Sequence, residues 1–296
     1  MEEVSNFELD ILPLVLQQSR LFSTADRLRV ATDLDYFFQP AVINASICFF
    51  FFATLHACLH ATAKFFPYGR VYACLKSNAH RAEWTGRSIA ILFALVCWPV
   101  SLYALTRLPA YRTDGFVARS ETADRLMEFG IGYFLYDTFV ALLYNDHMGT
   151  KTLAGKVSLV HHAAILGAIM LSYYFRVGSF LVLSALLTEF TNPFVMMRWL
   201  LDCAGMRSHP AYAANGLMMF FGFWLVRIPM TAFVWHRLIC WREQILAAPL
   251  ILSVSSVCLA LAMASLNVYW TYLITKGVLK HFVYKKRSVH IEKKSS

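Results

Sequence analysis

The chain has 296 residues, of which 58% are hydrophobic and only 15% are charged. That composition is too apolar for a typical soluble domain of this length. The formal net charge of +9 belongs largely to the C-terminal tail and the first loop, so we do not interpret it as a sign of nucleic-acid binding. The composition therefore indicates a polytopic membrane protein.

Seven stretches are long and apolar enough to cross a bilayer as helices, which takes about 20 residues for about 30 Å of hydrocarbon. The predicted spans are 41–63, 88–106, 126–145, 157–175, 178–201, 213–236 and 248–275. The connections between them are short, so we predict one all-α membrane bundle of about seven transmembrane helices over 41–275. A polar or interfacial segment, 1–40, precedes the bundle, and a basic cytosolic tail, 276–296, follows it.

The N-terminal segment does not have the pattern of a secretory signal. It begins MEEVSNFELD, which is acidic where a signal is basic, and no apolar run with a small-residue cleavage site follows. We therefore expect insertion to depend on an internal span. Residues 7–22 are interpreted either as a short interfacial helix or as an ordinary lead-in to the first span.

Cysteines and histidines give little support to a metal site. The seven cysteines form no C-x-x-C pair and lie mostly within or beside spans, so we predict neither a disulfide framework nor a zinc site. His56 and His60 stand four residues apart and so share one helix face, near an end of the first span. Membrane di-iron hydroxylases need three histidine boxes, which the sequence lacks, and we interpret this pair as histidines at the membrane interface.

Polar side chains in the third to sixth spans carry the main functional signal. An ionised group at mid-bilayer costs about 2.5–3.5 kcal/mol, so each needs a partner or a wet cavity. The residues concerned are Asp137, His161, His162, Glu189, Asn192, Arg198, Asn215 and Arg227. Because their helices are consecutive, we expect a shared polar pocket open to the cytosol. The alternative is a set of independent bonds between helices, such as Glu189 to Arg227.

The adjacent pair His161 and His162 is the leading catalytic candidate, with Asp137 as a group that could orient one of the rings. Histidine titrates near neutrality, which suits general acid–base work or phosphate recognition. Neighbouring residues on a helix point about 100° apart, so only one of the two aims at a given centre, and spacing does not tell which. Pro193, four residues after Glu189, predicts a kink and a freed backbone carbonyl.

Lysines and arginines in the loops predict the orientation, since cytosolic loops carry an excess of them. With a lumenal N-terminus, the cytosolic segments hold 15 such residues and the opposite segments hold 10, which favours a cytosolic C-terminus. The chain ends in KKSS, so Lys293 and Lys294 resemble a dilysine endoplasmic-reticulum retrieval signal, which cytosolic coat proteins read. The alternative is a basic tail that lies against anionic lipid headgroups.

Several blocks along the chain resemble a known family. They read EWTGR at 83–87, GYFLYD at 132–137, HHAAILG at 161–167, LLTEFTNPFVMMRWLL at 186–201 and NGLMMFFGFWLVRI at 215–228. In order and spacing they resemble the TLC-domain family, shared by translocation-associated membrane proteins, ceramide synthases and ceroid-lipofuscinosis proteins. Within it, the chain looks most similar to the branch of TLC-domain-containing protein 4. The resemblance covers residues from about 80 to 275.

The resemblance implies a multi-span helical fold, residence in the endoplasmic reticulum and a role in lipid homeostasis. In ceramide synthases the histidine pair lies in the active site that transfers a fatty acyl group from acyl-CoA to a sphingoid amine, and only His161 and His162 match that site. The chain departs from those enzymes in its later region, TEFTNP, which has Glu189 but not their further histidine and aspartates. It also has Ala90 and Phe93 where the closer branch usually has a serine and a histidine.

These observations favour a protein that binds a lipid or an acyl chain in the bundle and needs no cofactor. One alternative is an N-acyltransferase in which a histidine is the base or a transient acyl acceptor, while phosphates of acyl-CoA meet Lys151, Lys156 or Arg198. A lipid transporter is less favoured because paired broken helices are not visible in the sequence. A receptor is disfavoured because no D-R-Y follows the third span.

Overall fold

A computed structural model describes residues 24–65, 69–75, 77–113, 115–144 and 153–295. Over these residues the chain forms helices joined by short turns, without a strand, which confirms the predicted all-α membrane bundle. The α-helices are α2 (Thr24–Thr62), α3 (Gly69–Ala73), α4 (Asn78–Arg107), α5 (Ala110–Thr113), α6 (Glu121–Leu143), α7 (Leu153–Phe175), α8 (Ser179–Leu187), α9 (Asn192–Cys203), α10 (Pro210–Gly222), α11 (Ile228–Cys240), α12 (Arg242–Ala247) and α13 (Leu250–Ser295). Short 3-10 segments are η2 (Ala63–Phe65), η3 (Gly115–Val117) and η4 (Thr188–Thr191), and η5 (Phe223–Arg227) is a π-helix.

The predicted spans coincide with the long helical segments of the bundle. Within the described residues, six segments are long and apolar enough to cross a membrane: Pro40–Phe65, Asn78–Arg107, Glu121–Leu143, Ser179–Cys203, Pro210–Cys240 and Leu250–Lys280. The remaining predicted span, 157–175, lies in α7, a helix of 23 residues whose described apolar stretch is Leu159–Phe175.

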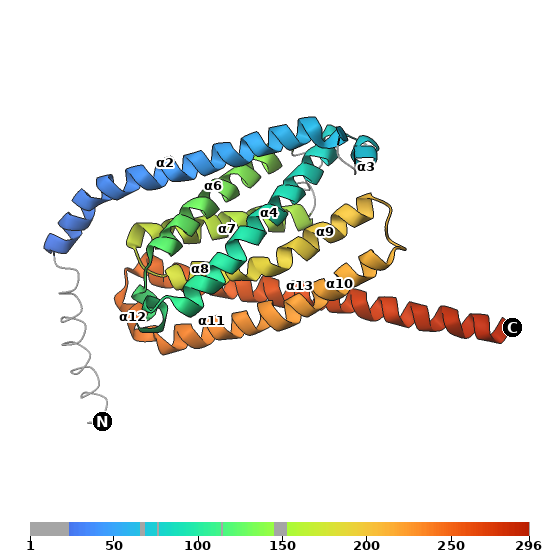
Figure 1. The fold of residues 1–296 in the computed structure, drawn as a ribbon. Helices are drawn as coiled ribbons and strands as arrows, with labels where there is room; N and C mark the ends of the chain where they lie inside the picture. Colours follow the sequence, from blue (N-terminus) through green and yellow to red (C-terminus); the bar gives the residue numbers. More distant parts are fainter. Residues whose placement is uncertain (1–23, 66–68, 76, 114, 145–152, 296) are drawn as a thin grey trace, which may run out of the picture.

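The first and last helices are longer than the predicted spans. α2 begins at Thr24, so its first part lies in what we predicted as a polar lead-in, whereas the possible interfacial helix at 7–22 falls outside the described residues. α13 continues as a helix to Ser295, so the backbone of Lys293 and Lys294 is helical. In Figure 1 this red helix runs well beyond the rest of the bundle.

The bundle has two ends, which we call the α12 end and the α9–α10 end (Figure 1). The α12 end holds α5, η3 and α12 together with the starts of α6, α8 and α13. The α9–α10 end holds α3, the start of α4 and the turn between α9 and α10. α13 leaves the bundle at the α9–α10 end, on the side that the charge count predicts to be cytosolic.

The helix starts follow from local capping groups. The side chain of Ser77 accepts the backbone N–H of His80 at 3.2 Å, and that of Ser120 accepts the N–H of Ala123 at 3.1 Å. Each serine therefore satisfies a donor that has no partner within the first turn. α4 and α6 begin at fixed positions, which in turn fixes the register of the residues that they send into the core.

The main buried core lies between α2, α4, α6 and α8. Phe93 of α4 is almost fully buried and stacks on Tyr133 of α6 with ring centroids 3.7 Å apart. Phe52 of α2 packs edge-on against Tyr133 at 5.3 Å. The stacked contact shows how the ring of Phe93 is accommodated in the core.

Two helical crossings are interrupted at the same depth in the bundle. The span Ser179–Cys203 changes from α8 through η4 to α9, so the helix is interrupted just before Pro193. The carbonyl that was predicted to be freed is that of Glu189, and it is not free, because it accepts the backbone N–H of Asn192. The span Pro210–Cys240 changes from α10 through η5 to α11. η4 and η5 contact each other, so both irregular segments face the same part of the interior.

Candidate functional site

A chamber of about 470 Å³ lies inside the bundle, toward the α9–α10 end. It is lined by residues of α4, α6, α7, η4, α9, α10, η5 and α13, so almost the whole helical array contributes to it. Six of the eight polar residues predicted from the sequence line this chamber: Asp137, His161, His162, Glu189, Asn192 and Arg227. The expected convergence of polar groups on one hollow is present, while the roles of these residues in catalysis or binding remain predictions.

Asp137 and His162 form a direct pair across α6 and α7. Nδ1 of His162 lies 3.0 Å from Oδ2 of Asp137, and both side chains are about one-fifth exposed, at 20% and 17%. With Nδ1 donating to the carboxylate, Nε2 is the nitrogen left for a substrate. A carboxylate that orients an imidazole through Nδ1 also occurs in the catalytic triads of hydrolases.

His161 has a different environment from its neighbour. Its ring lies edge-on to Trp270 of α13 with centroids 5.5 Å apart, and 5.9 Å from the ring of His162. Its Nδ1 is buried and has no hydrogen-bond partner among the described residues. The structure therefore separates the two histidines: His162 is oriented by an acid, and His161 packs against an aromatic ring.

Glu189 is a buried acid in η4 at the inner part of the chamber. It is 8% exposed, and its carboxyl group interacts with the side chain of Asn192, three residues later, and with the charges of Arg227 and His162. The direct bond from Glu189 to Arg227 that the sequence suggested is absent from the described hydrogen bonds and ion pairs. Glu189 lines the chamber, and its role there stays a prediction.

Arg227 instead bonds to neutral partners on two other segments. Its Nε donates to Oγ1 of Thr191 at 2.6 Å, and its Nη1 donates to Oδ1 of Asn267 at 3.1 Å. The guanidinium also lies over the rings of Phe223, at 4.7 Å, and Trp270, at 5.5 Å. A charge in the bundle interior is therefore held by hydrogen bonds and aromatic faces.

Arg198 and Asn215 do not line the chamber, which corrects the expectation that all eight polar residues share it. Nδ2 of Asn215 donates to the backbone carbonyl of Phe194 at 2.8 Å, and the guanidinium of Arg198 lies 4.2 Å from the ring centroid of Tyr212. Both contacts join α9 to α10. These two residues face the neighbouring helix because a polar group in a span needs a local partner, and here the partner is outside the hollow.

Four further chamber residues were not predicted as site residues. Glu83 and Arg87 form an ion pair of 2.7 Å on α4, and Arg87 also lies 4.6 Å from the ring centroid of Trp199. Tyr133 and Trp270 add aromatic walls. Glu83 and Arg87 could have been predicted, because they belong to the EWTGR block. The polar residue Asn267 in the last span could have indicated that α13 contributes to the interior of the bundle.

His56 and His60 lie outside the chamber and bond to tyrosines. Nδ1 of His56 is 2.7 Å from the hydroxyl of Tyr136, and Nδ1 of His60 is 2.8 Å from the hydroxyl of Tyr72. Tyr72 lies in α3, outside the spans, and burial raises the pKa of its hydroxyl. The two bonds tie α2 to α6 and to α3, and no three metal-ligating side chains gather anywhere in the described chain.

An apolar cavity of about 90 Å³ lies next to the chamber, between α7, α8, α11 and α13. Its walls are mainly aliphatic, with Ile165, Leu181 and Leu259 among them. Thr188 lines this cavity one residue before Glu189, and Thr231 lines it four residues after Arg227, whereas Glu189 and Arg227 line the chamber. Nδ2 of Asn267, which also lines the cavity, donates to Oγ1 of Thr231 at 3.0 Å. A chamber with ionisable groups and an apolar hollow therefore adjoin each other within one bundle.

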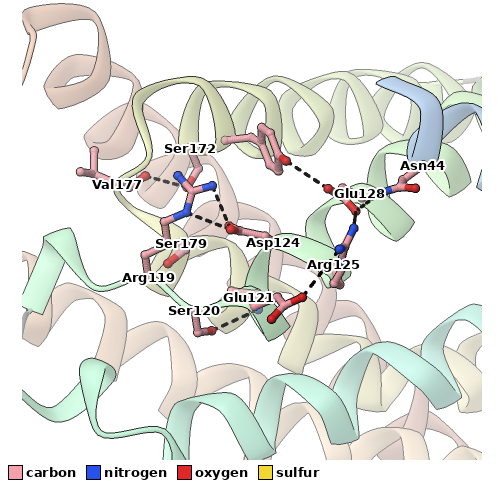
Figure 2. A network of polar contacts seen from close by, with 12 residues as sticks. Asn44, Arg119, Ser120, Glu121, Asp124, Arg125, Glu128, Ser172, Val177 and Ser179 are labelled. Atoms are coloured by element: carbon pink, nitrogen blue, oxygen red, sulfur yellow. Dashed lines mark hydrogen bonds and ion pairs between the residues drawn. The ribbon is translucent and has the colours of Figure 1, made fainter. Parts of the chain in front are cut away.

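A second polar network lies toward the α12 end (Figure 2). Glu128 of α6, which is 4% exposed, accepts hydrogen bonds from Asn44 of α2 at 2.9 Å, from Tyr173 of α7 at 3.0 Å and from Arg125 at 3.2 Å. Nearby, Arg119 pairs with Asp124 at 2.9 Å. The network joins three helices, and the sequence analysis missed it because Glu128 lies close to the predicted start of its span.

Comparisons with known proteins agree with this architecture. Residues 83–276, about two thirds of the chain, match the TLC domain, described as TRAM, LAG1 and CLN8. TLC domain-containing protein 4 A of Dictyostelium discoideum is 28% identical over 225 residues, covering 74% of this chain and 83% of that protein. TLC domain-containing protein 4 of Homo sapiens is 25% identical over 205 residues, covering 68% and 75%.

A relative with another name also matches. Protein CLN8 of Mus musculus is 26% identical over 200 residues, covering 66% of this chain and 68% of that protein. No solved structure matches the chain. Because the TLC domain extends over well more than half of the residues, including every side chain that lines the chamber, the chain belongs to the TLC-domain family.

Proposed function

We propose that the protein binds a lipid or an acyl chain inside the bundle and acts in membrane-lipid homeostasis. The observation that carries this proposal is the chamber itself. It gathers Asp137, Glu189 and Arg227 from candidate membrane spans, together with His162 from the apolar helix α7. Its volume of about 470 Å³ falls in the range of small-molecule sites. Buried ionisable groups in a membrane are costly and mark a functional pathway or a ligand site.

The shape of the interior favours an amphipathic ligand over a purely polar one. The chamber supplies carboxylates and imidazoles for a headgroup, and its aromatic and aliphatic walls suit a hydrocarbon chain. A lipid satisfies both parts at once, whereas an ion or a sugar would leave the apolar walls uncovered.

Gly86 offers a direct test, because it lines the chamber and a Cβ added there meets no atom within 4 Å. We expect Gly86→Leu to fill part of the chamber and to lower the lipid retained per mole of purified protein at least about threefold, as the side chain excludes ligand volume. The measurement is mass spectrometry of lipids extracted after purification in mild detergent.

Gly167→Leu is the matched control. This glycine lies in α7, is also free of neighbours within 4 Å, and does not line the chamber. Equal lipid retention by wild type and both variants would contradict binding in the chamber.

A second candidate function is acyl transfer, favoured by the Asp137–His162 pair. In that reaction Nε2 of His162 takes the proton of an amine as its nitrogen attacks the thioester carbonyl of acyl-CoA. The new C–N bond forms, the C–S bond breaks, and the thiolate of coenzyme A takes up the proton. Lys156, at the start of the described part of α7, is exposed and accessible to a phosphate.

We further propose that the protein resides in the endoplasmic reticulum with its C-terminus in the cytosol. The support is the KKSS ending with Lys293 and Lys294, and the excess of lysine and arginine on the side where α13 leaves the bundle. Cytosolic coat proteins are then the partners that read the tail. Replacing both lysines by serine should move a tagged protein toward the Golgi, and unchanged reticular staining would contradict retrieval.

A further inference from the structure

The chamber and the apolar cavity are separated by one layer of polar side chains. Consecutive residues of η4 face the two hollows: Thr188 lines the apolar cavity and Glu189 lines the chamber. In the same way, Arg227 of η5 lines the chamber, and Thr231, one turn later, lines the apolar cavity. The two irregular segments thus form the boundary between the hollows.

Four side chains at this boundary are joined by hydrogen bonds, and we call them the Arg227 bridge: Thr191, Arg227, Thr231 and Asn267. Besides the two bonds that Arg227 donates, Nδ2 of Asn267 donates to Oγ1 of Thr231 at 3.0 Å. Three members are almost fully buried, since Thr191 is 0%, Asn267 3% and Arg227 6% exposed. The bridge connects η4, η5, α11 and α13.

The bridge is a barrier to a hydrocarbon chain. An alkyl chain that passed from the chamber into the apolar cavity would displace the bond between Arg227 and Asn267, and a methylene group offers no hydrogen bond in exchange. The apolar cavity beyond has walls that suit methylenes, yet at about 90 Å³ it is smaller than the roughly 150 Å³ cavity that accepts a benzene molecule. It has room for only a few carbons.

We propose that the Arg227 bridge sets how deep the hydrocarbon chain of a bound lipid enters the bundle, and therefore which chain lengths fit. The proposal rests on the proposed lipid-binding function. The headgroup lies near Asp137 and His162, the chain runs along the chamber wall, and its methyl end stops at Arg227 and Asn267. Asn267 and Thr231 are then specificity-determining residues that need not touch the headgroup.

Asn267→Ala tests this inference, because it removes the acceptor for Arg227 and the donor to Thr231 and joins the two hollows. The purified full-length protein is incubated with a homologous series of saturated monoacylglycerols, from monolaurin to monobehenin, and retained lipid is quantified by mass spectrometry after gel filtration. We expect the longest well-retained chain to increase by about two to four carbons, in keeping with the small added volume.

Three further variants make the result specific. Ala260→Leu narrows the apolar cavity, so the double variant with Asn267→Ala should return to the wild-type chain-length profile. Val268→Ala, the exposed neighbour on the same helix, should leave the profile unchanged. Thr231→Ala weakens the bridge more mildly and should shift the profile in the same direction, which keeps the test valid if Asn267→Ala fails to fold.

The outcomes separate the inference from the proposed function. If wild type retains monoacylglycerols and the bridge variants show the same profile at equal thermal stability, the bridge is only a structural tie between helices and the inference is wrong. If wild type retains none of the series, lipid binding of this class and the inference built on it both fail.

Discussion

Asp137 holds the ring of His162 through Nδ1, and the proposed acyl transfer rests on this contact. A carboxylate 3.0 Å from Nδ1 keeps hydrogen on that nitrogen and leaves Nε2 as the base. Asp137→Asn keeps the size of the side chain but can present an amide N–H to the ring, which favours the other tautomer. We expect the variant to keep the fold around the pair, because the aspartate and asparagine side chains have nearly the same size.

If the protein transfers acyl groups, we expect Asp137→Asn to lower turnover of labelled acyl-CoA with a sphingoid base by at least about 100-fold. Thr138→Ala, the next residue on α6, should have little effect. Wild-type protein that gives no product above background would exclude this chemistry for the substrates tested.

The sequence predicted much of the site at the residue scale because a membrane makes polar groups conspicuous. Asp137, His162 and Glu189 each need a partner in hydrocarbon, so their convergence could be expected. The sequence could not predict which of His161 and His162 is oriented by an acid, because that depends on which ring the Asp137 carboxylate contacts. Glu128 was not predicted as an interacting residue, because an acid close to the end of a span is not conspicuous. Its carboxylate nevertheless accepts hydrogen bonds from three side chains (Figure 2).

At the scale of helices, irregular turns decide which polar residues share the chamber. Asn215 and Arg227 are twelve residues apart in one crossing, and a regular helix would place them 120° apart. The π-helix η5 changes that angle and aims Arg227 toward Thr191 and Asn267, whereas Asn215 bonds to α9. Pro193 and Pro229 hint at these breaks, but the sequence gives neither the type of turn nor the resulting face.

The contact between α2 and α6 depends on a glycine at the crossing point. A Cβ built at Gly132 would collide with Cβ of Cys48 and would lie 2.7 Å from the carbonyl oxygen of Ala45 and 2.9 Å from the nitrogen of Phe49. Two of these atoms belong to the backbone of α2, so a side chain cannot rotate away. Small residues allow this close approach, as they do in other membrane helix pairs.

We expect Gly132→Ala to separate α2 from α6 and to destabilise the protein by about 1–3 kcal/mol, the usual cost of overpacking. The measurement is a thermal unfolding curve of the detergent-solubilised protein. Gly86→Ala on α4, where a Cβ meets nothing within 4 Å, should unfold at or above the wild-type temperature. Equal midpoints for the two variants would show that the helices do not approach as closely as the structure indicates.

At the scale of the whole molecule, the placement of the chamber relative to the cytosol depends on the number of crossings. The chamber lies toward the α9–α10 end, from which α13 also leaves (Figure 1). If that end is cytosolic, a water-soluble acyl donor and the coat proteins reach the protein from the same side. The loop charges favour this orientation by 15 lysines and arginines to 10, and a measurement of sidedness tests it directly.

Two natural cysteines can report the sidedness. Cys74 is exposed between α3 and α4 at the α9–α10 end, and Cys240 is exposed where α11 ends, at the α12 end. Five helical crossings separate them: α4, α6, α7, α8 with α9, and α10 with α11. An odd number of crossings requires that the two thiols lie on opposite faces of the membrane.

We expect a membrane-impermeant maleimide to label Cys74 in sealed microsomes and to label Cys240 only after detergent opens them, in variants that keep one of these cysteines and have serine at the other six positions. A variant that keeps only Cys97, which is fully buried in α4, should resist labelling in both conditions. Labelling of Cys74 and Cys240 from the same side would mean that one of the five segments does not span the bilayer. Because α7 has the shortest described apolar stretch, it would be the segment that does not cross the bilayer. His161 and His162 would then lie at the membrane surface instead of inside the membrane.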